Sequence, residues 1–147
     1  MIQDFRDILA ALAGAQARFL VVGAHALAAH GVPRMTSDLD LLVEATPGNA
    51  RRVWQALVDF GAPLESLKIR ESDFTTADRV IQLGVAPWRI DIMTGISGVS
   101  FPEAWDGRMA DAMLGVPVSF IGREALIRNK RASGRSRDLE DVRALEG

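Results

Sequence analysis

The sequence predicts an α/β fold of the α+β type, in which a mixed, largely antiparallel sheet is flanked by helices. Short apolar runs such as residues 19–22 alternate with segments whose apolar residues recur at helical spacing, such as residues 47–60. The chain has 147 residues, 48% hydrophobic and 24% charged, which is typical of one soluble globular domain. We therefore expect a single domain over residues 1–147, with residues 123–147 as a short helical C-terminal extension packed on it.

The first half of the chain reads as two helix–strand units followed by a third helix. Apolar residues from position 2 to position 12 recur at helical spacing and are followed by Gly14, and residues 19–22 form a short apolar strand. An alanine-rich helix over residues 24–30 follows, and residues 38–43 alternate as a half-buried strand does. Thr46 before Pro47 is typical of a helix start, and this helix ends near position 60.

The second half is predicted from shorter patterns. Alternation of apolar and polar residues indicates strands, which we expect to be antiparallel in the middle of the chain. The expected strands are residues 67–70, 79–83, 88–93 and 116–121, and the expected helices are residues 101–113 (one or two short helices), 124–131 and 138–145.

Composition excludes several classes of protein. The chain has no cysteine, so a disulfide scaffold, a thiolate zinc site and a cysteine nucleophile are excluded. Charges or glycines interrupt every apolar run, and we expect no signal peptide, no membrane span and a cytoplasmic location. The formal net charge is −2, yet residues 123–137 carry six basic residues and one acid. This basic strip is either a surface for RNA or triphosphate or simply an exposed helix surface.

Two carboxylates on one strand are the first candidate for chemistry. Asp38 and Asp40 are two positions apart, so on a strand they point to the same side at about 6.5 Å from each other. Two explanations compete. The pair either lies on a solvated face, where the charges cost little, or holds a divalent metal ion such as Mg²⁺ through hard oxygen ligands.

A third carboxylate, Asp91, bears on that choice. It lies on an expected strand whose Ile90 and Ile92 point to the opposite face, so an acid there calls for a partner. The partner is an ion-paired Arg34 or Arg89 in one interpretation. In the other, this strand lies beside the first two acids, and the three carboxylates form a two-metal clamp of the kind that promotes phosphoryl transfer.

Gly23 lies between a strand and a helix. A glycine there lets backbone N–H groups approach a phosphate at the start of the helix, although glycines at strand ends more often serve the turn alone.

These residues resemble a known superfamily. Residues 21–24 (VVGA) and 38–41 (DLDL), with the later Asp91, look like the signature of the nucleotidyltransferases that include DNA polymerase beta. Residues 34–40 (RMTSDLD) are similar to the Arg-x-Thr-x-Asp-x-Asp of minimal nucleotidyltransferases that include the AbiEii-type toxins of bacterial toxin–antitoxin pairs. Their downstream lysine and Arg-x-x-Asp elements are matched by Lys130 and by residues 135–141.

The likeness extends over most of the chain. Residues 80–84, 89–91 and 98–105 also look like small uncharacterised bacterial nucleotidyltransferase-like proteins, so the resemblance spans roughly residues 19–145. It departs from the superfamily pattern at Ala24, where relatives have glycine or serine.

The resemblance implies Mg²⁺-dependent transfer of a nucleoside monophosphate from an NTP such as ATP to an acceptor hydroxyl, RNA or protein being candidate acceptors. It implies two Mg²⁺ ions, for which Mn²⁺ can substitute, and an antitoxin or a second copy of the chain as partner. The implied catalytic and metal-binding residues are Asp38, Asp40 and Asp91. The implied nucleotide-binding residues are Gly23, Ala24, Arg34, Thr36 and Lys130.

Two other functions remain open from the sequence. The chain is alternatively a non-catalytic module that keeps the fold and binds nucleotide, RNA or a partner protein, which Ala24 favours. A Mg²⁺-dependent nuclease is the third option, because three acids alone do not separate hydrolysis from transfer. Arg34 and Lys130 favour transfer because their charges suit a triphosphate.

Overall fold

The computed structural model describes residues 2–85 and 88–147, and within them six strands form one mixed sheet. The strands are β1 (Phe19–Val22), β2 (Asp38–Val43), β3 (Val80–Val85), β4 (Trp88–Met93), β5 (Met109–Met113) and β6 (Val116–Phe120). The helices are α1 (Ile2–Gly14), α2 (Gly23–Ala29), α3 (Pro47–Phe60), the 3₁₀ turn η1 (Glu71–Phe74), α4 (Phe101–Asp106), α5 (Arg123–Ser133) and α6 (Ser136–Glu146).

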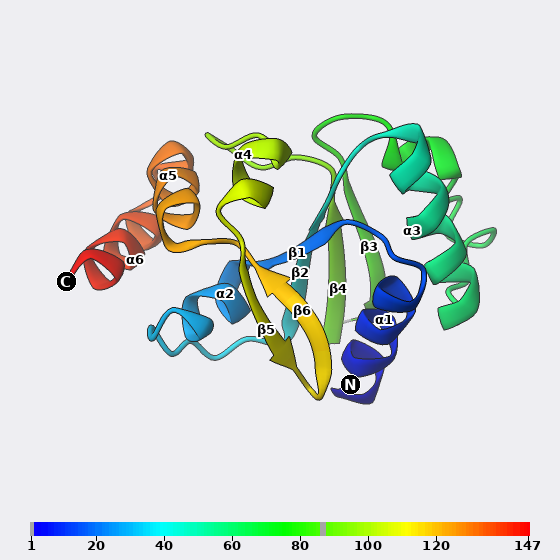
Figure 1. Ribbon diagram of the computed structural model, residues 1–147, viewed down its shortest axis with the longest axis horizontal. Coiled ribbons are helices and arrows are strands. Elements are labelled where there is room, and N and C mark those ends of the chain that lie inside the picture. The colour runs from blue at the N-terminus through cyan, green and yellow to red at the C-terminus, as the bar shows by residue number, and fades with distance from the viewer. Residues whose placement is uncertain (1, 86–87) are drawn as a thin grey trace.

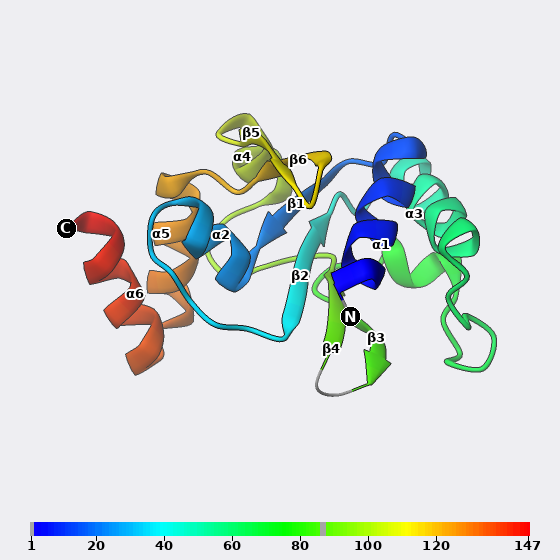
Figure 2. The same ribbon diagram turned by 90° about the horizontal axis from the view of Figure 1, so that it is seen from below.

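The strand order is β3-β4-β2-β1-β6-β5. Neighbours β3/β4, β2/β1 and β6/β5 are antiparallel, whereas β4/β2 and β1/β6 are parallel. The sheet is therefore mixed and largely antiparallel, as the sequence predicts. Helices α1 and α3 lie to one side of the sheet and α2, α5 and α6 to the other (Figures 1 and 2).

The core lies between the sheet and its helices. Ile8, Leu20, Leu41 and Ile92 are fully buried and come from α1, β1, β2 and β4. Burial of such side chains is the main favourable term in folding, at roughly 25 cal/mol per Å² of apolar surface. Among the described residues, none of the helices combines the length and the hydrophobicity of a membrane-spanning segment.

Most predicted elements in the first half have the expected bounds. Helix α3 begins where the Thr46 hydroxyl accepts a hydrogen bond from the Asn49 N–H at 3.3 Å. It ends at Gly61, whose φ of 88° is typical of a helix C-terminus, so both bounds agree with the sequence. Strands β2 and β4, which carry the three acids, also match their predicted ranges.

The prediction of a strand over residues 67–70 is wrong. These residues form turns, with Lys68 at a φ of 58° and the Ile69 N–H donating to the Leu64 carbonyl at 2.9 Å. Ile69 is 9% exposed, so the alternation that resembled a strand reflects one apolar side chain anchoring a turn.

The prediction of helix up to residue 113 is half wrong. Helix α4 ends at Asp106, and Met109–Met113 is strand β5, paired antiparallel with β6. The turn between them has Leu114 and Gly115 at φ of 53° and 80°, which is typical of a tight hairpin. The hairpin pairing overrides the weak helical pattern of this stretch.

Candidate active site

Two neighbouring parallel strands place two carboxylates side by side. Asp40 on β2 is in register with Asp91 on β4, so their side chains leave the sheet on the same face. Asp40 is half-buried and Asp91 is 9% exposed. The sheet therefore brings together two of the three acids that the sequence singles out.

This proximity is unfavourable when both groups are charged. Burial, followed by the charges of Asp91 and Asp38, raises the pKa of Asp40 to about 6, although the charges of Lys130 and Arg89 act in the opposite direction. Burial also raises the pKa of Asp91, against the lowering effect of Arg89. A bound cation would offset both the cost of burying these carboxylates and the repulsion between them.

The fit of this pair to a divalent cation rests on a second observation. The Oδ1 atom of Asp91 is buried and has no hydrogen-bond partner among the described residues. A buried carboxylate oxygen without a partner is costly, and hard oxygen ligands are those that Mg²⁺ prefers. The Asp40–Asp91 pair thus has the chemistry of a Mg²⁺ site.

Asp38 is turned toward another partner. Arg89 Nη2 donates to Asp38 Oδ2 at 3.1 Å, and both side chains are partly exposed. With the side chains as they stand, no three His, Asp or Glu groups in the described part of the chain are arranged to hold one metal ion. Asp38 could join the other two acids only by leaving Arg89, and an exposed ion pair of this kind is weak.

The loop before β2 is fixed by Thr36. Its hydroxyl accepts the Asp38 N–H at 3.0 Å, which sets the start of the strand. Thr36 therefore shapes the backbone next to the acids.

Gly23 packs directly against Asp40. Its φ is 67°, and a Cβ at this position would collide with Asp40 Oδ2 and lie only 3.0 Å from Cγ. Only glycine satisfies both the left-handed backbone and this close approach. The turn from β1 into α2, which includes Ala24, consequently lies against the carboxylate pair.

Lys130 and Arg34 approach from outside the sheet. Lys130 Nζ lies 3.1 Å from Asp141 Oδ2 and 3.4 Å from Asp138 Oδ1, and Arg34 also pairs with Asp141. Asp141 is 1% exposed, so it is a buried anchor for both cations. Lys130 is still close enough for its charge to lower the pKa of Asp40.

Asp138 and Asp141, which hold Lys130 and Arg34 in place, are not among the candidate site residues identified from the sequence. Helix α6 begins at Ser136, two residues before the expected start, and Asp138 in its first turn pairs with Arg135 at 2.9 Å. Their role could have been inferred from their spacing, because both acids lie on the same buried face of α6 as Val142 and Leu145. A carboxylate on an apolar helix face requires a cation nearby.

The basic strip of residues 123–137 is partly neutralised. Arg128 pairs with Glu103, Arg131 with Glu146 and Arg135 with Asp138. These pairs favour the interpretation of an exposed helix surface over that of a polyanion-binding track.

Comparison with known proteins supports the architecture. No family model matches the sequence, and no curated protein matches it. The proposed nucleotidyltransferase TM1012 from Thermotoga maritima superposes with a TM-score of 0.64 at 18% identity, covering 95% of this chain and 88% of that one. The chain has a nucleotidyltransferase fold.

A second protein gives the same result. The antibiotic-resistance factor ANT(2'')-Ia superposes with a TM-score of 0.58 at 18% identity, covering 98% of this chain and 81% of its own. Its complex with adenylyl-2''-tobramycin gives a TM-score of 0.54 at 16% identity, with 98% and 86% covered. These identities show the fold alone, and the resemblance to AbiEii-type toxins stays a prediction.

Proposed function

We propose that this protein is a nucleotidyltransferase that moves a nucleoside monophosphate from an NTP to an acceptor hydroxyl. The observation that carries the proposal is the Asp40–Asp91 pair with the Gly23 turn packed against it. Paired carboxylates suit a metal ion that binds phosphate oxygens, and a close-packed glycine turn lets backbone N–H groups approach a phosphate. The fold of the chain is compatible with this chemistry.

In this proposal Asp40, Asp91 and, after leaving Arg89, Asp38 hold Mg²⁺ or Mn²⁺. The metal supplies positive charge that stabilises the phosphate oxygens in the transition state. Backbone N–H groups after Gly23, starting at Ala24, face the phosphates.

Lys130 and Arg34 add charge near the triphosphate, and Asp141 fixes their position. Catalysis then comes mainly from positioning and charge neutralisation, as expected for phosphoryl transfer.

The reaction balances without a further reactant. The acceptor oxygen bonds to the α-phosphorus, the bond from that phosphorus to the β-phosphate oxygen breaks, and pyrophosphate leaves. The hydroxyl proton passes to the Asp91 carboxylate, whose Oδ1 has no hydrogen-bond partner among the described residues. The complex of ANT(2'')-Ia with adenylyl-2''-tobramycin shows that a related fold accommodates an adenylylated small molecule.

The test is a labelling reaction with each α-labelled NTP, Mg²⁺, and either total RNA or cell extract. Label in RNA, in protein or in a small molecule identifies the acceptor class and supports transfer. An Asp91→Asn variant serves as the matched inactive control. If no fraction carries label above that control, the proposal is wrong.

A non-catalytic nucleotide- or partner-binding module is the second candidate. The pairing of Asp38 with Arg89, and of Arg34 and Lys130 with Asp141, favours it, because these groups are already satisfied within the chain. This candidate predicts binding of NTP or of a partner protein without release of pyrophosphate. An antitoxin or a second copy of the chain is the partner to test.

A further inference from the structure

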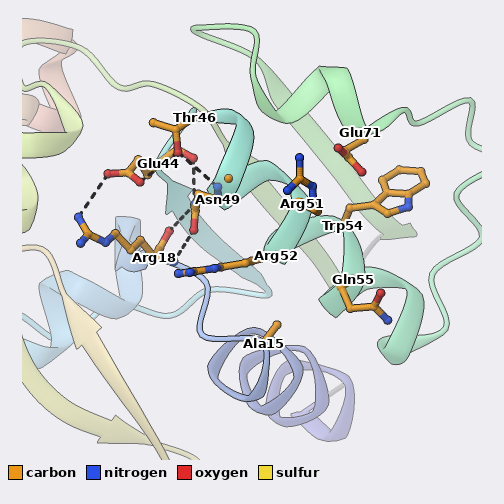
Figure 3. Close-up of a pocket in the computed structure, with 11 residues that line it drawn as sticks. Ala15, Arg18, Glu44, Thr46, Asn49, Arg51, Arg52, Trp54, Gln55 and Glu71 are labelled. Atoms are coloured by element: carbon orange, nitrogen blue, oxygen red, sulfur yellow. Dashed lines mark hydrogen bonds and ion pairs between the residues drawn. The ribbon is translucent and has the colours of Figure 1, made fainter.

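A pocket lies near the ends of β1 and β2 that are opposite to the carboxylate pair. Arg18 precedes β1 and Glu44 follows β2, whereas Gly23 and Asp40 lie at the other ends of the same strands. The pocket has a volume of about 790 Å³, within the usual range for small-molecule sites. Its lining includes Arg18, Glu44, Asn49, Arg51, Arg52 and Trp54 (Figure 3).

The base of this pocket is rigidly built around Asn49, which is 4% exposed. Its Nδ2 donates to the carbonyls of Arg18 and Glu44 at 3.0 and 2.9 Å, and its Oδ1 accepts the Arg18 N–H at 2.7 Å. These bonds tie α3 to the ends of β1 and β2. The pocket is thus a fixed feature of the fold.

One cation in the pocket already has its partners. Arg18 lies 3.5 Å from Glu44 Oε2, and its guanidinium stacks over the Trp105 ring at 5.4 Å. Glu44 also accepts a hydrogen bond from the Thr46 hydroxyl at 3.1 Å. The Arg18–Glu44 pair therefore leaves no net charge for a ligand.

Two further guanidinium groups of the pocket have no carboxylate partner within residues 2–85 and 88–147. Arg52 donates to the Gln16 carbonyl at 3.2 Å, and Arg51 has neither a hydrogen bond nor an ion pair among the residues that the structure describes. Glu71 is the remaining carboxylate in the lining, so the pocket carries a net positive charge. Figure 3 shows Arg52 running across the pocket toward Arg18, and Arg51 on the side of Trp54 and Glu71.

We propose that this pocket binds a phosphorylated small molecule, whose phosphate accepts hydrogen bonds from Arg51, while Arg52 adds positive charge from the other side of the pocket. A guanidinium is a planar fork that matches two phosphate oxygens, and Trp54 offers an aromatic surface beside it. The two sites lie at different ends of the sheet, and the arginine pocket has no carboxylate pair to hold a metal. Binding there is therefore independent of Mg²⁺ and of the proposed transfer reaction.

The experiment is calorimetry of the full chain in EDTA, with inorganic phosphate and AMP as the two probes. The native protein binds at least one of them, and Arg51→Ala weakens that binding about tenfold or more, as expected for loss of a charged hydrogen bond. Arg143→Ala, on the exposed side of α6, is the matched control and binds like the native protein. A probe whose binding changes in Asp40→Asn but not in Arg51→Ala would occupy the carboxylate site and would overturn the inference.

The two probes distinguish the source of the phosphate. Binding of phosphate alone indicates a free anion, and binding of AMP but not phosphate indicates a nucleotide-like ligand with Trp54 contributing. Arg51→Lys keeps the positive charge but lacks the planar guanidinium, so it should bind the probe with intermediate affinity. This second variant keeps the test decisive if Arg51→Ala does not fold. The inference is overturned if neither probe binds at millimolar concentration, or if both Arg51 variants bind like the native protein.

Discussion

Replacing Asp40 by asparagine should stabilise the metal-free protein. The structure raises the pKa of this carboxyl from 3.8 to about 6, so the folded state resists its ionisation. A shift of about 2 units corresponds to roughly 3 kcal/mol, which partial exposure of the side chain reduces to about 1–2 kcal/mol. For a chain of this length the melting temperature should rise by about 3–6 °C at pH 7.

The pH dependence of stability independently tests whether the Asp40 charge destabilises the fold. Because the folded-state pKa is the higher one, the native protein loses stability as pH rises from about 4 through about 6. The variant has no carboxyl at this position, so its advantage should vanish near pH 4 and be complete above pH 6. Melting curves followed by circular dichroism in EDTA at both pH values measure this difference.

Asp38→Asn is the matched control for this experiment. Asp38 is paired with Arg89 at a partly exposed position, so its replacement should leave the melting temperature unchanged or slightly lower. A fall in the melting temperature of Asp40→Asn at pH 7 would refute the reasoning, because it would make the Asp40 charge a stabilising partner in the fold.

Three other substitutions test neighbouring parts of the site. Gly23→Ala should lower the free energy of unfolding by at least about 2 kcal/mol in urea titrations, because the new Cβ meets Asp40 and the backbone φ is positive; an unchanged midpoint would contradict this contact. Arg89→Gln should tighten Mg²⁺ binding severalfold in calorimetry, since it frees Asp38; equal or weaker binding would argue against a metal role for that acid. Lys130→Gln should destabilise the protein by about 1–3 kcal/mol through its buried partners on α6, and unaltered stability would show that those carboxylates are satisfied without it.

The two acid-bearing strands could be predicted because local patterns decide them. Asp38 and Asp40 alternate with buried leucines, and Asp91 alternates with Ile90 and Ile92, so each strand has one apolar face whatever its neighbours are. That β4 lies parallel and adjacent to β2 depends on tertiary pairing, which alternation alone does not determine.

The partners of the charged side chains could not be predicted from the sequence, because they also depend on tertiary structure. The sequence offers Arg89 as a partner for Asp91, whereas the register of β2 and β4 places Arg89 opposite Asp38, with which it forms an ion pair. The ion pair between Lys130 and Asp141 depends on how α6 packs against α5, and the sequence pattern does not determine that packing. Strand β5 was missed because its pattern is weak and its pairing with β6 is what stabilises it.

Calorimetry of NTP binding with and without Mg²⁺ tests the central claim most directly. If Asp40 and Asp91 form the metal–nucleotide site, the native protein binds NTP more tightly with Mg²⁺ than with EDTA, because phosphate oxygens complete the coordination of the ion. Asp91→Asn should lose this Mg²⁺-dependent gain while melting as a folded protein. NTP binding that is equally tight in EDTA, or a gain that survives in Asp91→Asn, would contradict the assignment of the carboxylate pair.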